Sequence, residues 1–113
     1  MITFSYKEHE LEAYLLKFSH ALGYKCLKLT GEVGIPDRLI IGKHGCSMYA
    51  ELKRSHNAAI SAAQEACLED LVSRGMFAYR LNNKEEVRKA LYELTMRDRN
   101  AKALKESINQ MET

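Results

Sequence analysis

Residues 34–53 read GIPDRLIIGKHGCSMYAELK, and this stretch decides the fold. Two runs rich in branched and aromatic apolar residues, 36–41 and 46–53, lie on either side of a short turn at 43–45. Such runs separated by a glycine-containing turn predict an antiparallel β-hairpin in which Gly45 takes a positive φ.

The same hairpin is predicted to bring two carboxylates together. Asp37 begins the first strand and Glu51 lies near the end of the second, so pairing around 43–45 places both at one end of the sheet. Glu51 and Lys53 are two residues apart and therefore share a face. Neighbouring carboxylates repel unless a proton or a cation lies between them, and their oxygens are preferred ligands of Mg²⁺ and Mn²⁺. The pattern indicates a divalent-ion site beside a lysine, which suits phosphodiester hydrolysis.

A simpler interpretation of these residues is also available. Glu51 and Lys53 would form a solvated ion pair, and Asp37 would be a turn residue after the sole proline, because short patterns of this kind recur by chance. The context favours the metal site: a proline opens the strand, a hairpin separates the two halves, and a helix containing Gln64 follows.

Length and composition place the chain among single-domain globular proteins. It has 113 residues, of which 46% are hydrophobic and 28% charged, and this excludes collagen, low-complexity disorder and a disulfide-dense scaffold. No apolar stretch approaches the roughly 18 residues of a membrane span. Glutamates at 8, 10 and 12 lie where a signal peptide would be apolar, so we expect a cytoplasmic protein without membrane contact.

Periodicity and capping signals predict the other elements. In chain order these are a helix over 6–22, a strand over 24–30, the hairpin strands, a helix opened by Ser61-x-x-Gln64, a strand over 76–81 and a helix opened by Asn83. The order is αβββαβα. Beyond residue 99 the chain is charged but keeps a thin apolar stripe at helical spacing. We therefore expect a domain over 1–99 and a helical tail over 100–113 that packs on its own domain or on a partner chain.

Basic residues gather around the hairpin although the net charge is only +2. Six of them lie between Gly23 and His56: Lys25, Lys28, Arg38, Lys43, Lys53 and Arg54. A phosphate polymer would be attracted to such a segment. The alternative is that these side chains are ordinary solvent-facing decoration of the strands.

As a set, these motifs resemble the VRR-Nuc nucleases of the PD-(D/E)XK superfamily. The similarity runs from the first helix to Tyr79 and rests on five matches: Glu12 within 11–15, Lys28, the stretch 34–41, Glu51-Leu52-Lys53 and Ser61-x-x-Gln64. The resemblance implies an α/β fold in which a mixed sheet is flanked by helices around an αβββαβ core. The last helix and tail would extend that core.

The resemblance also implies roles for the residues of the divalent-ion site. Asp37 and Glu51 match the metal-binding carboxylates and Lys53 the catalytic lysine. Leu52 would contribute its backbone carbonyl to the ion, and Glu12 would bind it directly or through water. Glu12 has a second interpretation, as one of several glutamates that favour the macrodipole of the first helix.

Further residues are expected to support the site or to contact DNA. Gln64 matches a helix glutamine that braces the site or touches DNA, although it would also serve as a simple helix cap. Lys28 matches a position suited to gripping phosphate. Arg38, Lys43 and Arg54 are candidate DNA contacts because they belong to the basic segment.

The function implied by the resemblance is that of a Mg²⁺- or Mn²⁺-dependent endodeoxyribonuclease of the stand-alone phage or bacterial type. Its sharpest form is a homodimeric resolvase of four-way (Holliday) junctions, because symmetric cleavage of a junction needs two sites related by a two-fold axis. Three alternatives stay open. One is a less selective nuclease acting on flaps, single strands or duplex ends. Another is a non-catalytic nucleic-acid-binding module that needs a partner. The third is a metal-independent interaction domain, which would require Asp37 and Glu51 to point apart.

Overall fold

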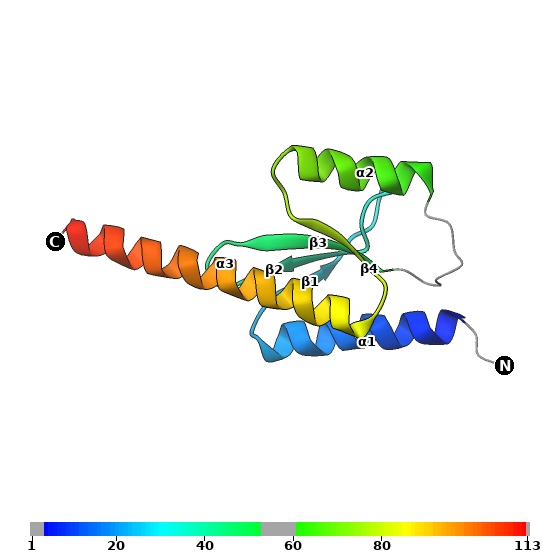
Figure 1. The fold of residues 1–113 in the computed structure, drawn as a ribbon, viewed down its shortest axis with the longest axis horizontal. Coiled ribbons are helices and arrows are strands. Elements are labelled where there is room, and N and C mark those ends of the chain that lie inside the picture. The colour runs from blue at the N-terminus through cyan, green and yellow to red at the C-terminus, as the bar shows by residue number, and fades with distance from the viewer. Residues whose placement is uncertain (1–3, 53–60, 113) are drawn as a thin grey trace.

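The computed structural model describes residues 4–52 and 61–112, with the side chains of 4–8 left aside (Figure 1). Its elements are α1 (Phe4–Ala21), β1 (Lys25–Lys28), β2 (Arg38–Ile41), β3 (Ser47–Leu52), α2 (Ala62–Ser73), β4 (Ala78–Leu81) and α3 (Lys84–Met111). This is the predicted αβββαβα order. Lys53 and Arg54 lie outside the described residues.

The sheet is mixed, as the resemblance implied. Its strand order is β1-β2-β3-β4, with antiparallel pairing from β1 to β3 and parallel pairing between β3 and β4. A parallel pair needs a crossover connection, and α2 lies in the connection between β3 and β4.

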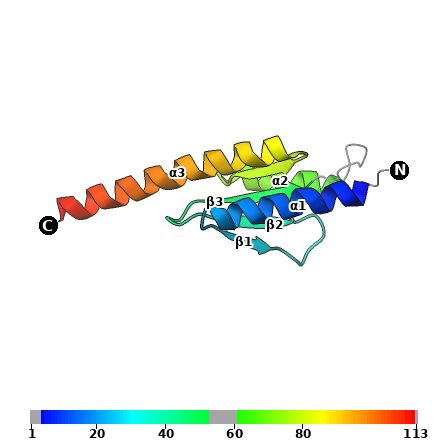
Figure 2. The same ribbon diagram turned by 90° about the horizontal axis from the view of Figure 1, so that it is seen from below.

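Helices cover both faces of the sheet but bury them unequally. Helices α1 and α3 lie side by side on one face and α2 lies on the other (Figures 1 and 2). The core lies under α1 and α3, where Ile40 and Met48 are paired across β2 and β3 and are both fully buried. Helix α2 has no buried residue. Alternation along β3 therefore sends Met48, Ala50 and Leu52 into the core and leaves Tyr49 and Glu51 on the α2 face.

The local signals in the sequence are confirmed at the turns and helix starts. Gly45 has a φ of +96° in the β2–β3 turn, a region that L side chains rarely adopt. Ser61 and Gln64 form a complete capping box at the start of α2, and the Asn83 side chain accepts a hydrogen bond from the Glu86 N–H at the start of α3.

A carboxylate from α3 holds the hairpin turn. Asp98 is 3% exposed and accepts hydrogen bonds from the backbone N–H groups of Lys43 (2.8 Å), His44 (2.9 Å) and Cys46 (3.2 Å). Its approach leaves no room for a side chain at Gly42, where a Cβ would lie 2.6 Å from the Asp98 carboxyl carbon. This anchor was not predicted from the sequence, because Asp98 sits among charged residues near the end of the expected domain.

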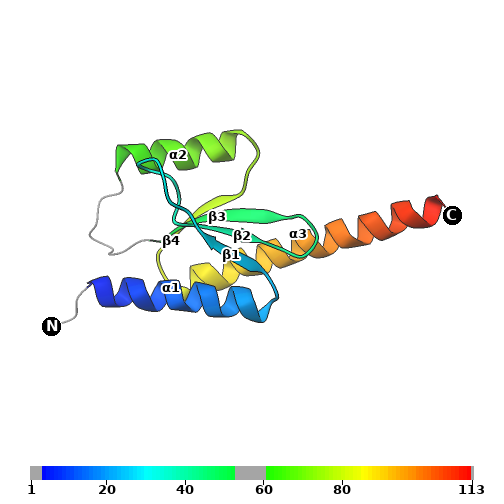
Figure 3. The same cartoon turned by 180° about the vertical axis from the view of Figure 1, so that it is seen from behind.

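Helix α3 runs without a break past residue 100, so the proposed division after residue 99 falls inside one helix. Its last turns extend beyond the sheet (Figures 1 and 3). Three residues of the apolar stripe predicted beyond residue 99 are exposed there: Leu104, Ile108 and Met111. No helix within the described residues is both long and apolar enough to cross a bilayer.

We expect the contact between Gly42 and Asp98 to show as non-additive stabilities. Gly42→Ala should lower the free energy of unfolding by about 1–3 kcal/mol, because the new methyl group meets the Asp98 carboxylate. Asp98→Ala should cost about 2–4 kcal/mol, because three backbone N–H groups lose their acceptor. In the double variant the methyl group has room, so its cost should fall by about 1 kcal/mol or more.

Urea unfolding of the two single variants, the double variant and wild type measures this coupling. Lys102→Ala is the matched control, because it removes only an exposed ion pair with Glu106 and should change stability by less than about 1 kcal/mol. Strictly additive costs for Gly42→Ala and Asp98→Ala would contradict the contact.

Candidate active site at the open end of the hairpin

The structure brings the two predicted carboxylates to one end of the sheet. Arg38 is paired with Ala50, so Asp37 and Glu51 are the next residues beyond that pair. The Leu29 N–H donates to the Asp37 carbonyl oxygen at 2.9 Å and continues the strand ladder to this point. The Asp37 Oδ2 atom accepts a hydrogen bond from the Leu52 N–H at 2.8 Å. The Asp37 carboxylate is thus fixed beside the backbone that carries Glu51.

Glu51 is held from the other side by α2. Its side chain is buried, at 5% exposure, and its Oε2 accepts a hydrogen bond from Gln64 Nε2. The Gln64 Oε1 accepts the Ser61 N–H at 3.0 Å, and Ser61 Oγ accepts the Gln64 N–H at 3.1 Å. Because the Ser61 N–H occupies the side-chain Oε1 of Gln64, the side-chain NH₂ group of Gln64 is turned toward Glu51. Gln64 therefore caps α2 and also holds the Glu51 carboxylate, so the two roles considered for it in the sequence are compatible.

Glu12 lies on the opposite face of the sheet from Glu51. Its Oε2 forms an ion pair at 3.3 Å with Arg38, whose side chain is only 11% exposed. Arg38 is in register with the core residue Ala50, and both therefore face α1. The neighbouring thiol of Cys26 has its pKa raised by burial, an effect that the Arg38 charge partly offsets. Arg38 is thus engaged by the protein itself.

The basic candidates do not gather in one place. Lys28 is exposed and in register with Arg38, so it lies at the same end of the sheet as Asp37. Lys43 lies in the turn at the opposite end, and β2 alone separates it from Asp37 by about 13 Å.

Arg80 is a further candidate residue that was not predicted from the sequence. In the parallel ladder between β3 and β4 it is the register partner of Glu51, and it is exposed. The alternation over 76–81 predicted a strand but did not show which strand it would pair with. The pairing with β3 is what brings Arg80 beside Glu51.

The described donor set suits a magnesium-like ion bound partly by its substrate. No group of three or more His, Cys, Asp or Glu side chains within 4–52 and 61–112 is arranged to hold a metal. Asp37 and Glu51 supply carboxylate oxygens from adjacent strands. Mg²⁺ is commonly bound by one or two carboxylates together with water and substrate phosphates. These two residues fit that mode of binding.

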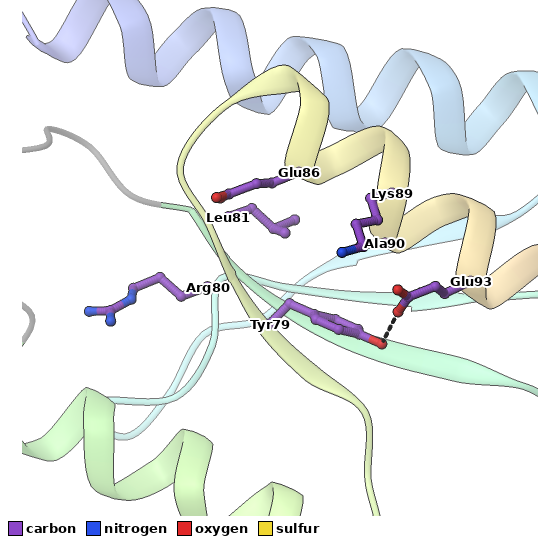
Figure 4. A pocket seen from close by; sticks show the side chains of 7 residues that line it. All are labelled: Tyr79, Arg80, Leu81, Glu86, Lys89, Ala90 and Glu93. Carbon is purple, nitrogen blue, oxygen red and sulfur yellow. Dashed lines mark hydrogen bonds between the residues drawn. The ribbon is translucent and has the colours of Figure 1, made fainter.

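A separate pocket lies between β4 and α3 (Figure 4). It has a volume of about 210 Å³ and is lined by Tyr79, Arg80, Leu81, Glu86, Lys89, Ala90 and Glu93. The Tyr79 hydroxyl donates to Glu93 Oε2 at 3.0 Å, and burial together with Glu93 raises the pKa of Tyr79. Tyr79 faces the core side of the sheet, so this pocket is distinct from the carboxylate site.

Among the solved structures that are similar to this chain are two VRR_NUC domain structures. One is described as a "VRR_NUC domain"; it superposes with a TM-score of 0.70 at 26% identity and covers 80% of this chain and 97% of that chain. The other, a "VRR_NUC domain protein", has a TM-score of 0.63 at 18% identity and covers 77% and 86%. No family model and no curated protein sequence matches the chain. The structural matches confirm the resemblance to VRR-Nuc domains and the fold that it implied.

We expect Gln64→Glu to expose the contact with Glu51 through pH. Glutamate keeps the capping box but sets a second carboxylate against Glu51, so at pH 7 the free energy of unfolding should fall by about 1–3 kcal/mol. A proton shared by the two carboxylates relieves the repulsion in the folded state. The folded variant then binds more protons than the unfolded chain, so its deficit should shrink as the pH falls toward about 4.

Urea unfolding between pH 4 and pH 8 tests this expectation. The matched control is Ser61→Ala, which removes the cap at a cost of about 1 kcal/mol and adds no charge. A Gln64→Glu deficit that stays constant with pH, like that of the control, would contradict the contact.

Proposed function

We propose that this VRR-Nuc-like chain is a divalent-metal-dependent endonuclease that hydrolyses phosphodiester bonds in DNA. The observation that carries the proposal is the pairing of Asp37 with buried Glu51, each held by its own hydrogen-bond donor. The likeness at 26% identity to a structure described as a VRR_NUC domain supports a nuclease.

Asp37, Glu51 and the Leu52 backbone carbonyl would hold the Mg²⁺ or Mn²⁺ ion in this proposal. When bound, such an ion polarises the phosphoryl oxygen and lowers the pKa of a bound water. Glu12 is already paired with Arg38, so its proposed contribution is through water.

The protein's own groups orient the reactants. The Leu52 N–H fixes the Asp37 carboxylate, and Gln64 fixes that of Glu51. Both carboxylates therefore reach their positions before DNA arrives, and this avoids reorganisation during the reaction. Lys53 follows Glu51 by two residues, and we assign to it the orientation of the water or the stabilisation of charge on the phosphate.

The proposed substrate is branched DNA, with the four-way junction as its sharpest form. One site cuts one strand, so symmetric resolution of a junction requires two copies of the chain related by a two-fold axis. A homodimer would also double the basic surface available to the phosphates of the junction.

We expect Glu51→Gln to lower the cleavage rate by about 100-fold or more, because the amide lacks the charge that binds the ion. End-labelled four-way junction, duplex and single strand are incubated in Mg²⁺, in Mn²⁺ and in EDTA, with wild type, Glu51→Gln and Lys53→Ala. The control, Glu69→Gln, removes an exposed carboxylate from α2 and should cut like wild type. Wild-type cleavage by Glu51→Gln would contradict the proposed site.

The pattern of products separates the substrates. Symmetric, metal-dependent cuts near the crossover support the resolvase. Equal cutting of single strands or duplex ends supports a less selective nuclease. If wild type binds DNA but leaves it intact in both metals, the nucleic-acid-binding module is supported in place of the nuclease.

We further expect Asp37→Asn to weaken Mn²⁺ binding in the absence of DNA, because one of the two carboxylates is lost. Titration calorimetry measures the affinity directly, and urea unfolding shows whether the Leu52 N–H keeps its acceptor. Equal Mn²⁺ affinity in wild type and Asp37→Asn would remove Asp37 from the metal site.

A further inference from the structure

We infer that Arg80 binds a phosphate of the DNA strand at the cleavage site, an inference that rests on the proposed function. The register of the sheet carries it. Asp37, Glu51 and Arg80 form a row across β2, β3 and β4, because Glu51 is in register with Arg80 and Asp37 lies one residue beyond the Arg38–Ala50 pair. Neighbouring strands are only about 4.8 Å apart.

The side chain of Arg80 lies on the face that carries Glu51. Its neighbours Tyr79 and Leu81 are in register with Ala50 and Leu52, which face the core. Figure 4 shows Arg80 pointing away from β4 in the direction opposite to Tyr79. Arg80 is therefore exposed on the side of the sheet where α2 braces Glu51.

Among the described residues, none is a partner for the Arg80 side chain. It forms no hydrogen bond or ion pair with any other residue of 4–52 or 61–112. Four other arginines do have a described partner: Arg38 (Glu12), Arg74 (Asp70), Arg88 (Tyr14) and Arg97 (the Phe77 ring). Within the described part of the chain, the Arg80 guanidinium is therefore unpaired, one strand away from the proposed metal ligand.

The chemistry of this position suits a phosphate. A guanidinium offers a planar pair of N–H donors that binds two phosphate oxygens at once. The carboxylates of Asp37 and Glu51 would be neutralised by the ion, so the row presents positive charge to the DNA backbone when the ion is bound. Arg80 would then hold the DNA strand next to the ion that Asp37 and Glu51 bind.

The test measures DNA binding separately from cleavage. Fluorescein-labelled four-way junction is titrated with wild type, Arg80→Ala, Arg80→Lys and Arg99→Ala, in Ca²⁺ and in EDTA, over a range of NaCl concentrations. Arg99→Ala is the matched control: Arg99 is exposed on α3, next to the residue that anchors the opposite end of the hairpin. It removes the same charge far from the proposed site.

Arg80→Ala should weaken binding about tenfold and reduce the slope of log K against log salt by about 0.9, the loss of one phosphate contact. Arg80→Lys should restore the slope but only part of the affinity, because an ammonium does not bind bidentately. Mn²⁺ affinity without DNA and the urea midpoint should match wild type in all three variants, which separates a DNA contact from a structural role.

Wild-type affinity and slope in Arg80→Ala would overturn the inference, as would an equal loss in Arg99→Ala or no binding of DNA by wild type. The two proposals fail separately. If wild type binds but never cuts, while Arg80→Ala binds weakly, the contact stands and the nuclease falls. If wild type cuts and Arg80→Ala binds and cuts equally well, the nuclease stands and the contact falls.

Discussion

The antiparallel register of β2 and β3 is the constraint on which the rest of the structure depends. Successive residues of β3 face opposite sides, so a slip by one residue would exchange Met48 and Ala50 for Tyr49 and Glu51 in the core. Aspartates secure this register at both ends. Asp98 binds the backbone of the turn, and Asp37 binds the Leu52 N–H where the hairpin opens. Both use a carboxylate to accept backbone N–H groups that would otherwise lack a partner.

The features that could be predicted from the sequence are those determined by residues close together in the chain. The hairpin with its positive-φ Gly45, the capping box at Ser61 and the cap at Asn83 depend on contacts within a few residues, and all were confirmed. The anchor at Asp98 was beyond this reasoning, because its partners lie 52–55 residues away in the chain. Arg80 was missed for a related reason. Alternation gives the faces of a strand but not its neighbour, and only the pairing with β3 brings Arg80 beside Glu51.

The motifs led to Asp37 and Glu51, and the structure adds how these carboxylates are held. A buried carboxylate loses hydration and needs donors within the protein. The side-chain NH₂ group of Gln64 donates to Glu51 because the Oε1 of the same amide is occupied by the Ser61 N–H. The first turn of α2 thereby orients the Glu51 carboxylate on β3. The Glu12 carboxylate pairs with Arg38 on the α1 face, so the role we propose for it at the ion is through water.

The packed core and the candidate site lie on opposite faces of the sheet. The packed core lies under α1 and α3, whereas α2 buries no residue fully and contributes Gln64 to the site. Figure 1 shows α2 on the opposite face of the sheet from α1 and α3. Helix α2 can therefore be optimised for the position of one amide without disturbing the main core.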